Sequence, residues 1–406
     1  MVRAPAILET LNMKIETIPH PSGDQLPILL DNDGLPIPLA TEFILARRSL
    51  ATNTLVRNLR ELTLLFEWQK RRSIDLVARI RNNQKLRESE VVGSLVEALR
   101  RERPNDKTVK KIAVLPDTFN HRLATVRLFI RWCFELRLVA VPVEAEEYKG
   151  LCEHKNLVED WLYRCSIKSP PTNTGNRKGI NTKETDFLIK HLEPHNTLSN
   201  TKGSAVKLRN YLVVTILLYH GLRPGELLCL KVKDIEFGAI SGLRVTRRHP
   251  DPLDTRRPRP QIKRNGRVFA IENSRFIRLL DDYILNAREF LLDSQRDPEY
   301  LILSDEGNPL SQASITTFFS RLRQRFPNDL PAHLTAKSLR HSFSSNMEKK
   351  LREIGMDEEK RREALAYLRG DSSLDSQNIY IAQEVKEQSD IALRAYQEQL
   401  CKEEPQ

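Results

Sequence analysis

A polar stretch near the middle of the chain limits how its 406 residues can fold. Residues 168–182 read KSPPTNTGNRKGINT, a run of small and basic side chains with two prolines and two glycines. Such a composition offers little apolar surface to a core and is typical of a linker. We therefore expect a domain boundary within 168–182. The chain is long enough for two or three domains, each with a core of its own.

Before this linker, apolar residues at spacings of three and four predict helices through most of 41–167. The pattern is clearest in four segments, at 40–49, 52–72, 88–103 and 118–139. Their polar faces are basic, which fits an ordinary solvated surface as well as contact with DNA. Residues 1–40 differ, because LPILLDNDGLPIPL (26–39) predicts two short strands around an Asn-Asp-Gly turn.

After the linker, the pattern predicts a domain over 183–395 that is mainly α with a small antiparallel β-sheet. Asn181 and Glu184 have the spacing of a capping box, so a helix should begin there. The apolar run 210–220 predicts a buried helix that Gly221 ends, and Pro224 suits the first turn of the next helix. Further patterns predict strands at 232–237, 241–248, 266–272 and 299–305, helices at 275–291 and 311–326, and a tail at 396–406.

The charge of the chain favours a polyanionic partner. Its formal net charge is +11, and residues 244–267 hold nine Arg or Lys against two Asp. The sequence shows no apolar run of about 18 residues and no secretory leader at its start, so we expect an intracellular protein without a membrane span. Its five cysteines lack CxxC spacing, which argues against a zinc site or a disulfide framework.

Three separated segments carry the residues of chemical interest: GLRPGEL (221–227), AKSLRHSF (336–343) and SQNIYI (376–381). They contain Arg223, Arg340 and Tyr380, with Glu226 placed to brace the first arginine and His341 beside the second. Taken singly, an arginine before a helix, a buried histidine and a tyrosine are more often structural. Taken together, two guanidinium groups can clamp one phosphate, and a tyrosine can attack it.

These segments, in this order, resemble the tyrosine recombinase (phage integrase) family over most of 180–390. GLRPGELLCLKVKDI is similar to the first arginine box of the family, and SLRHSF is similar to the second. GDSSLDSQNIYI resembles the C-terminal box, which ends in the nucleophile. The resemblance implies a catalytic domain at 183–395 and a helical core-binding domain at 41–167. It assigns catalytic roles to Arg223 and Arg340, and the role of nucleophile to Tyr380.

The resemblance also assigns three further positions to the active site. Lys263 in QIKRNGRVFAI matches the lysine of the family's β-hairpin, the general acid. Lys337 stands where the family usually has a histidine, and it can still donate to phosphate. Asp371 stands where the family has histidine or tryptophan, and an ionised carboxylate cannot donate. The expected DNA contacts around the hairpin are Arg247, Arg248, Arg256, Arg257, Arg259, Arg264 and Arg267.

The function implied is site-specific recombination through a 3′-phosphotyrosyl intermediate, for integration, excision or transposition of a mobile element. This chemistry needs neither a cofactor nor a metal. The implied partners are double-stranded DNA recombination sites, a homo-tetramer on paired sites, and partner recombinases or accessory proteins. The C-terminal helix around 391–400 could then pack on a neighbouring protomer, and the expected location is cytoplasmic and nucleoid-associated.

Three other readings of the sequence stay open. A type IB topoisomerase-like or telomere-resolving enzyme would use the same residues to give different products. A non-catalytic DNA-binding protein on the same fold would fit the departures at Lys337 and Asp371. A helical protein-interaction scaffold would leave the order of arginines, lysine and tyrosine as coincidence.

Overall fold

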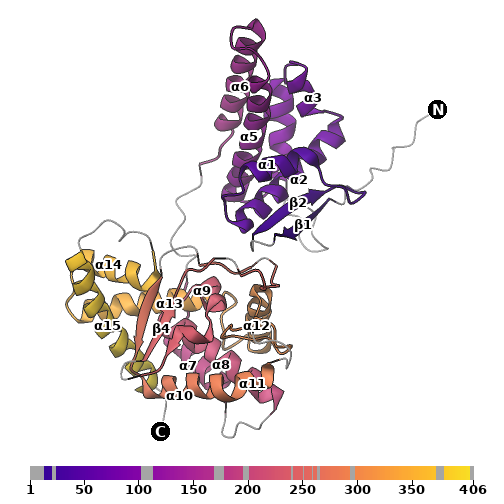
Figure 1. Cartoon of the computed structure of the whole chain (residues 1–406). Coiled ribbons are helices and arrows are strands. Elements are labelled where there is room, and N and C mark those ends of the chain that lie inside the picture. The colour runs from indigo at the N-terminus through magenta and orange to yellow at the C-terminus, as the bar shows by residue number, and fades with distance from the viewer. Residues whose placement is uncertain are drawn as a thin grey trace. The chain divides into compact units, whose positions relative to one another are not determined.

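The structure is a computed structural model, shown in Figure 1. It describes residues 13–20, 24–101, 113–168, 178–194, 201–238, 241–249, 251–257, 259–262, 266–292, 298–371 and 379–402. The chain divides into two compact units, 1–173 and 174–406, and the division falls inside the expected linker. The fold is mainly helical with two small antiparallel sheets, which confirms the predicted fold class.

A short antiparallel hairpin opens the first unit, formed by β1 (Lys14–Pro19) and β2 (Gln25–Leu30). The expected turn at 31–34 is present, and the Asp31 carboxylate accepts two backbone hydrogen bonds there. Beyond it, however, only a single bridge forms, between Leu30 and Pro36. Proline has no amide hydrogen to donate, so a second strand does not develop and β2 pairs with the preceding segment instead.

Helices make up the rest of the first unit: α1 (Pro38–Ala46), α2 (Thr52–Arg72), α3 (Leu76–Arg81), the π-helix η1 (Ser89–Leu95), α4 (Val96–Arg100), α5 (Pro116–Val139) and α6 (Glu146–Arg164). The four predicted helical segments are confirmed. Helix α6 was not among them, although its buried Leu151, His154, Val158 and Trp161 recur at helical spacing between charged residues. The rings of Phe43 and Phe129 meet edge to face at 5.3 Å within the core.

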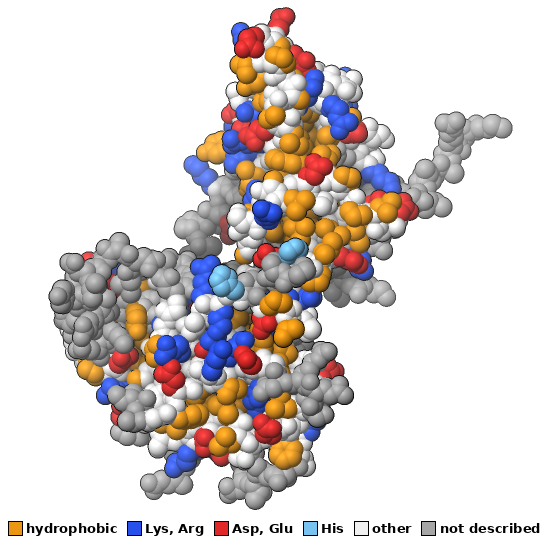
Figure 2. All heavy atoms as spheres, in the orientation of Figure 1, with side chains coloured by type: hydrophobic (Ala, Val, Ile, Leu, Met, Phe, Trp, Pro, Cys, Tyr) orange, Lys and Arg blue, Asp and Glu red, His pale blue; other side chains and the backbone are white. Residues whose placement is uncertain are grey.

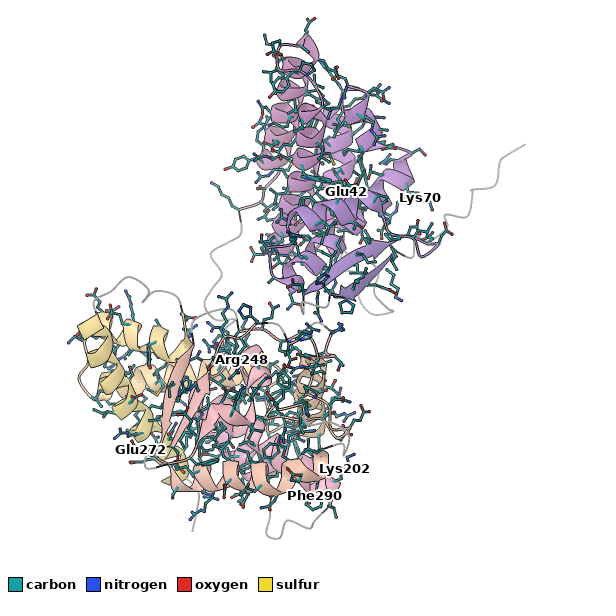
Figure 3. All side chains as sticks on the ribbon, in the orientation of Figure 1. Glu42, Lys70, Lys202, Arg248, Glu272 and Phe290 are labelled. Carbon is teal, nitrogen blue, oxygen red and sulfur yellow. The ribbon has the colours of Figure 1, made fainter. Side chains whose placement is uncertain are left out.

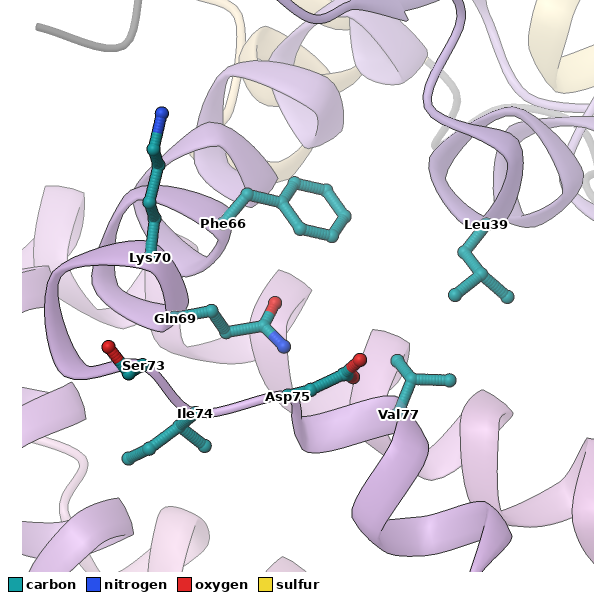
Figure 4. Close-up of a pocket in the computed structure, with 8 residues that line it drawn as sticks. All are labelled: Leu39, Phe66, Gln69, Lys70, Ser73, Ile74, Asp75 and Val77. Atoms are coloured by element: carbon teal, nitrogen blue, oxygen red, sulfur yellow. The ribbon is translucent and has the colours of Figure 1, made fainter. Parts of the chain in front are cut away.

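A shallow hollow of about 490 Å³ lies beside the turn that links α2 to α3 (Figure 4). Ser73 takes a left-handed conformation at this turn, with φ of 52°, and Asp75 caps α3 by accepting from the amide of Ala78. The residues that line the hollow are Leu39, Phe66, Gln69, Lys70, Ser73, Ile74, Asp75 and Val77.

The second unit is built around α8 (Lys202–His220), whose last ten residues are all buried. The other helices are α7 (Thr182–Leu192), α9 (Pro224–Cys229), η3 (Val232–Asp234), α10 (Ser274–Asp282), the π-helix η4 (Tyr283–Ala287), α11 (Arg288–Leu291), α12 (Gln312–Arg325), α13 (Ala336–Glu353), α14 (Glu358–Arg369) and α15 (Ile379–Lys402). The predicted capping box at Asn181 and Glu184 is confirmed at the start of α7.

A three-stranded antiparallel sheet lies beside these helices, in the order β3 (Ile235–Glu236), β4 (Ser241–Val245) and β5 (Arg267–Ile271). Leu243 is the partner of both Ile235 and Phe269, so the buried face of the sheet is apolar. The predicted strand at 299–305 is wrong. Residues 300–303 are buried but make only single bridges, such as Leu303 to Pro309, and proline cannot continue a ladder.

Helix α15 packs on its own unit and runs to Lys402, through part of the expected tail at 396–406. Tyr396 is 3% exposed, its hydroxyl donates to Leu218 O at 3.2 Å, and Leu393 and Leu400 are buried beside it. The apolar spacing of three, four and seven residues continues past 395, so the helix continues with it. Among the helices of the described ranges, none is both long and apolar enough to cross a membrane.

Candidate active site

The site begins at the junction between α8 and α9, where Gly221 has a left-handed backbone with φ of +56°. A Cβ atom on this residue would lie 2.1 Å from the ring of Phe343 on α13. Only glycine satisfies both the backbone and this contact. Leu339 and Phe343 are fully buried, and the close approach brings the two arginine segments together.

Arg223 is the N-cap residue of α9, and Pro224 occupies the first helical position as predicted. Its Nη1 donates to Glu226 Oε1 at 2.7 Å and to the carbonyl of Gly370 at 3.3 Å. The Glu226 carboxylate also accepts a hydrogen bond from the Arg223 amide at 2.9 Å. One carboxylate therefore holds both the backbone and the side chain of Arg223. The Arg223 side chain remains 26% exposed and can reach a ligand.

Arg340 lies on the first turns of α13 and is 7% exposed. Its guanidinium donates to the carbonyls of Gly221 at 2.6 Å and Arg369 at 2.8 Å, which satisfy the ends of α8 and α14. Burial, assisted by the charge of Arg223, lowers the pKa of Arg340 to about 9. The group is therefore still a cation at neutral pH, held rigidly beside the more exposed Arg223.

Glu226 is the buried anion that offsets these charges, with a side chain 1% exposed. Arg267 donates to it twice, at 2.9 and 3.2 Å, and is equally buried. Burial opposes ionisation of Glu226, but hydrogen bonds and charge from Arg267, with hydrogen bonds from Arg223, lower its pKa overall. Glu226 is thus an ionised brace shared by two arginines, as the sequence predicts for Arg223.

Replacing Glu226 with alanine should lower the free energy of unfolding by about 3–5 kcal/mol, because Arg267 would remain buried without a counter-charge. Chemical denaturation of the full chain, followed by a probe in the second unit, measures this loss. Glu236→Gln is the matched control, since Glu236 and Arg244 form an exposed pair whose loss should cost less than about 1 kcal/mol. Equal effects of the two variants would contradict the role of Glu226.

Asp371 completes the group and follows Gly370, whose φ of +60° ends α14. Its Oδ1 accepts a hydrogen bond from Arg223 Nη2 and lies 4.0 Å from Arg340 Nη2. Its Oδ2 lies 3.3 Å from Arg369 Nε. The side chain that departs from the family pattern therefore sits between the two arginines, with 30% of its surface exposed.

His220 lies directly behind this group, fully buried against the rings of Phe269 and Phe276. Burial, together with the charge of Arg267, lowers its pKa to about 3. Between pH 6.5 and 3 the unfolded chain therefore binds a proton at this residue that the folded chain does not.

The free energy of unfolding should therefore decrease as the pH is lowered through this window. Between pH 7 and pH 5, the His220→Phe variant should lose roughly 2 kcal/mol less of this free energy than the unmodified chain. Denaturation curves at the two pH values measure the difference. His333→Phe, which changes an exposed histidine of the same unit, is the control. An unchanged pH response in His220→Phe would contradict a neutral, buried His220.

Of the remaining predicted site residues, the structure describes Lys337 and His341 in full. Lys337 is exposed on the first turn of α13, and His341 is half-buried on the same helix. Lys263 and Arg264 lie outside the described residues. The segment before them is described, and the carbonyl of Gln261 lies close enough to α9 that a Cβ on Gly225 would approach it to 3.0 Å. Tyr380 falls in the first turn of α15, but its side chain lies outside the described residues.

Lys and Arg side chains gather on one face of the second unit, as Figure 2 shows. Several of the arginines expected to contact DNA are nevertheless buried and hydrogen-bonded inside the protein. Arg267 pairs with Glu226, while Arg256 pairs with Asp254 and donates to two backbone carbonyls. Arg259 is buried and donates to the carbonyl of Asp254. In this structure the guanidinium groups of Arg256 and Arg267 are therefore bound to buried carboxylates.

Arg247 and Arg257 are exposed, which suits them better to contacts with a ligand. Arg248, labelled in Figure 3, pairs with Asp234 while 28% exposed. Sequence reasoning missed Arg369, whose carbonyl binds Arg340 and whose guanidinium lies near Asp371. Its position two residues before Asp371 was the available signal. Within the described ranges, no group of three or more His, Cys, Asp and Glu side chains could hold a metal ion.

Comparison with known proteins gives one family. The model of the phage integrase family matches residues 185–385. Among solved structures, the chain is similar to the Tn1549 transposon integrase in complex with circular intermediate DNA, with 16% identity, 86% of this chain and 97% of that chain covered, and a TM-score of 0.49. It is also similar to the XerH site-specific recombinase bound to its difH substrate, with 16% identity, 83% and 88% covered, and a TM-score of 0.38. The sequence matches no curated protein.

Proposed function

Because the chain belongs to the tyrosine recombinase family, as its phage integrase domain at 185–385 indicates, we propose that it is a site-specific DNA recombinase. It would cleave and rejoin DNA strands to integrate, excise or transpose a mobile element. The observation that carries the proposal is the convergence of Arg223 and Arg340 on a single anion, the carboxylate of Asp371. A pair of guanidinium groups that holds one carboxylate can hold the non-bridging oxygens of one phosphate.

The proposed reaction is a transesterification at this phosphate. The Tyr380 oxygen attacks phosphorus, the bond to the 5′-oxygen breaks, and the strand is left joined to the protein through a 3′-phosphotyrosyl bond. Lys263 gives a proton to the departing 5′-oxygen, and the tyrosine releases its own proton to solvent on attack. Arg223, Arg340 and Lys337 stabilise the negative charge that develops on the phosphoryl oxygens. A 5′-hydroxyl from a second strand then reverses the step.

The first unit is proposed to bind the DNA duplex as a core-binding domain. Helix α2 and the turns beside it present exposed basic side chains: Arg48, Arg57, Arg60, Lys70, Arg71 and Arg72. Contacts of this kind go mainly to phosphates and position the duplex. In this proposal four protomers act on two paired recombination sites, with any accessory proteins, at the nucleoid.

The test is a covalent trap. The full chain is incubated with nicked duplex fragments from the DNA flanking its own gene, so that cleavage releases a short strand and cannot reverse. We expect an adduct that survives SDS and carries the label of the upstream strand, because the protein is joined to a 3′-phosphate. DNA binding without any adduct would favour a non-catalytic protein on this fold.

The products of a reaction on two intact sites separate the remaining enzymes. Junctions between the two sites are expected for a recombinase. Relaxed circles alone would favour a type IB topoisomerase-like activity, and hairpin ends would favour a telomere-resolving enzyme. Only the first product agrees with the proposed function.

A further inference from the structure

Asp371 differs from the other anion of the site in how it is held. Glu226 is 1% exposed and is locked by bonds from Arg267 and Arg223. Asp371 is 30% exposed and accepts from Arg223, with Arg340 and Arg369 at 4.0 and 3.3 Å. Glu226 is therefore part of the framework, whereas the Asp371 carboxylate lies at the open side of the arginine pair.

The charge balance shows what Asp371 contributes. Four arginine side chains (Arg223, Arg267, Arg340 and Arg369) meet two carboxylates here, which leaves two positive charges unbalanced. Without Asp371 there would be three. The carboxylate thus neutralises part of the field on which phosphate binding depends, and it does so from the place between the two arginines.

A carboxylate and a phosphodiester present the same features to a guanidinium fork, namely a negative charge shared by two oxygens. Both cannot bind the same donors at once, and like charges this close repel. An ionised Asp371 also cannot donate to a phosphate oxygen as histidine or tryptophan would. Its position on Arg223 therefore fits a competitor of the phosphate better than a helper.

We propose that Asp371 is an internal phosphate mimic that occupies the arginine pair in the free protein and must leave it when the scissile phosphate binds. The identity of that phosphate rests on the proposed function, but the competition for an oxyanion does not. The Asp371 carboxylate would then neutralise part of the positive charge of the arginine pair until a ligand that makes more contacts displaces it.

The test measures binding of inorganic phosphate to the full chain by isothermal titration calorimetry. Asp371→Asn keeps the shape and one acceptor oxygen of the side chain but removes its charge. We expect it to bind phosphate at least about tenfold more tightly than the unmodified chain, which is about 1.4 kcal/mol. The gain should disappear in the double variant Asp371→Asn/Arg223→Ala, because the freed donor belongs to Arg223.

Glu236→Gln is the matched control, since it also removes one carboxylate from an arginine in the same unit. A tenfold gain in this control would mean a general charge effect and would overturn the proposal. The proposal would also be overturned if Asp371→Asn bound phosphate no more than twofold more tightly than the unmodified chain, or more weakly. The latter result would make Asp371 a residue that positions the arginines. If Asp371→Asn fails to fold, Asp371→Ala, which removes the charge without adding a donor, is measured in its place.

The covalent trap keeps this inference separate from the proposed function. A phosphate gain without any DNA adduct would support the mimic and contradict the recombinase. An adduct without a phosphate gain would support the recombinase and contradict the mimic. Where both hold, Asp371→Asn should lower the DNA concentration needed for half-maximal cleavage.

Discussion

Tyr380→Phe is expected to abolish the covalent adduct with nicked DNA completely while leaving DNA affinity within about twofold. The substitution removes only the phenolic oxygen, the atom that would bond to phosphorus, and a phenylalanine ring has no nucleophile to replace it. Binding should persist because phosphate contacts by arginine and lysine do not involve this oxygen. The measurement is adduct formation on denaturing gels, beside a mobility-shift titration of the same variant.

Two other tyrosines serve as controls for this result. Tyr396 is buried with its hydroxyl bonded to Leu218 O, and burial raises the pKa of Tyr367, so neither is suited to attack. Tyr367→Phe and Tyr396→Phe should both retain the adduct. An adduct that survives in Tyr380→Phe and vanishes in one of these variants would move the nucleophile to that residue. Mass spectrometry of the peptide joined to DNA gives the same answer independently.

Arg340→Ala is expected to slow strand cleavage by about 10²–10³, the usual loss on removing one preorganised donor from a charge-stabilising site. Arg340 is already fixed by the carbonyls of Gly221 and Arg369, so little of its binding energy is lost to ordering during the reaction. Arg223→Ala should give a loss of the same order. Single-turnover cleavage of a nicked substrate at saturating protein measures both rates.

The control for these arginine variants is Arg244→Ala, which removes an exposed guanidinium paired with Glu236 on the sheet. It should cleave within about twofold of the unmodified chain. Circular dichroism and thermal unfolding of each variant separate slow chemistry from poor folding. A well-folded Arg340→Ala variant that cleaves at the normal rate would remove the arginine pair from the proposed mechanism.

The residues predicted best from the sequence are those whose role is fixed by local geometry. Gly221 and Pro224 mark the end of one helix and the start of the next, and Glu226 lies one turn from Arg223. Spacing alone therefore predicted the brace. The apolar run of α8 likewise shows its burial in the sequence, because a helix that is apolar on every side is buried.

The burial of several arginines could not be predicted, because it depends on partners far away along the chain. Arg267 lies in a basic segment, and nothing near it in the sequence indicates a buried bond to Glu226, 41 residues earlier. Arg256 is committed in the same way to carbonyls of Leu228 and Leu310. A count of basic residues measures the charge of a segment but does not tell which guanidinium groups face solvent.

Helix α15 has a mechanical consequence for the proposed intermediate. It begins at Ile379, and a buried anchor at Tyr396 and Leu400 fixes its far end to α8. The helix rises about 30 Å from Tyr380 to Leu400, at about 1.5 Å for each residue. A DNA strand bonded to Tyr380 would pull on the N-terminal end of this helix. Tension on the strand would then be carried along the backbone hydrogen bonds of the helix into the core of the domain.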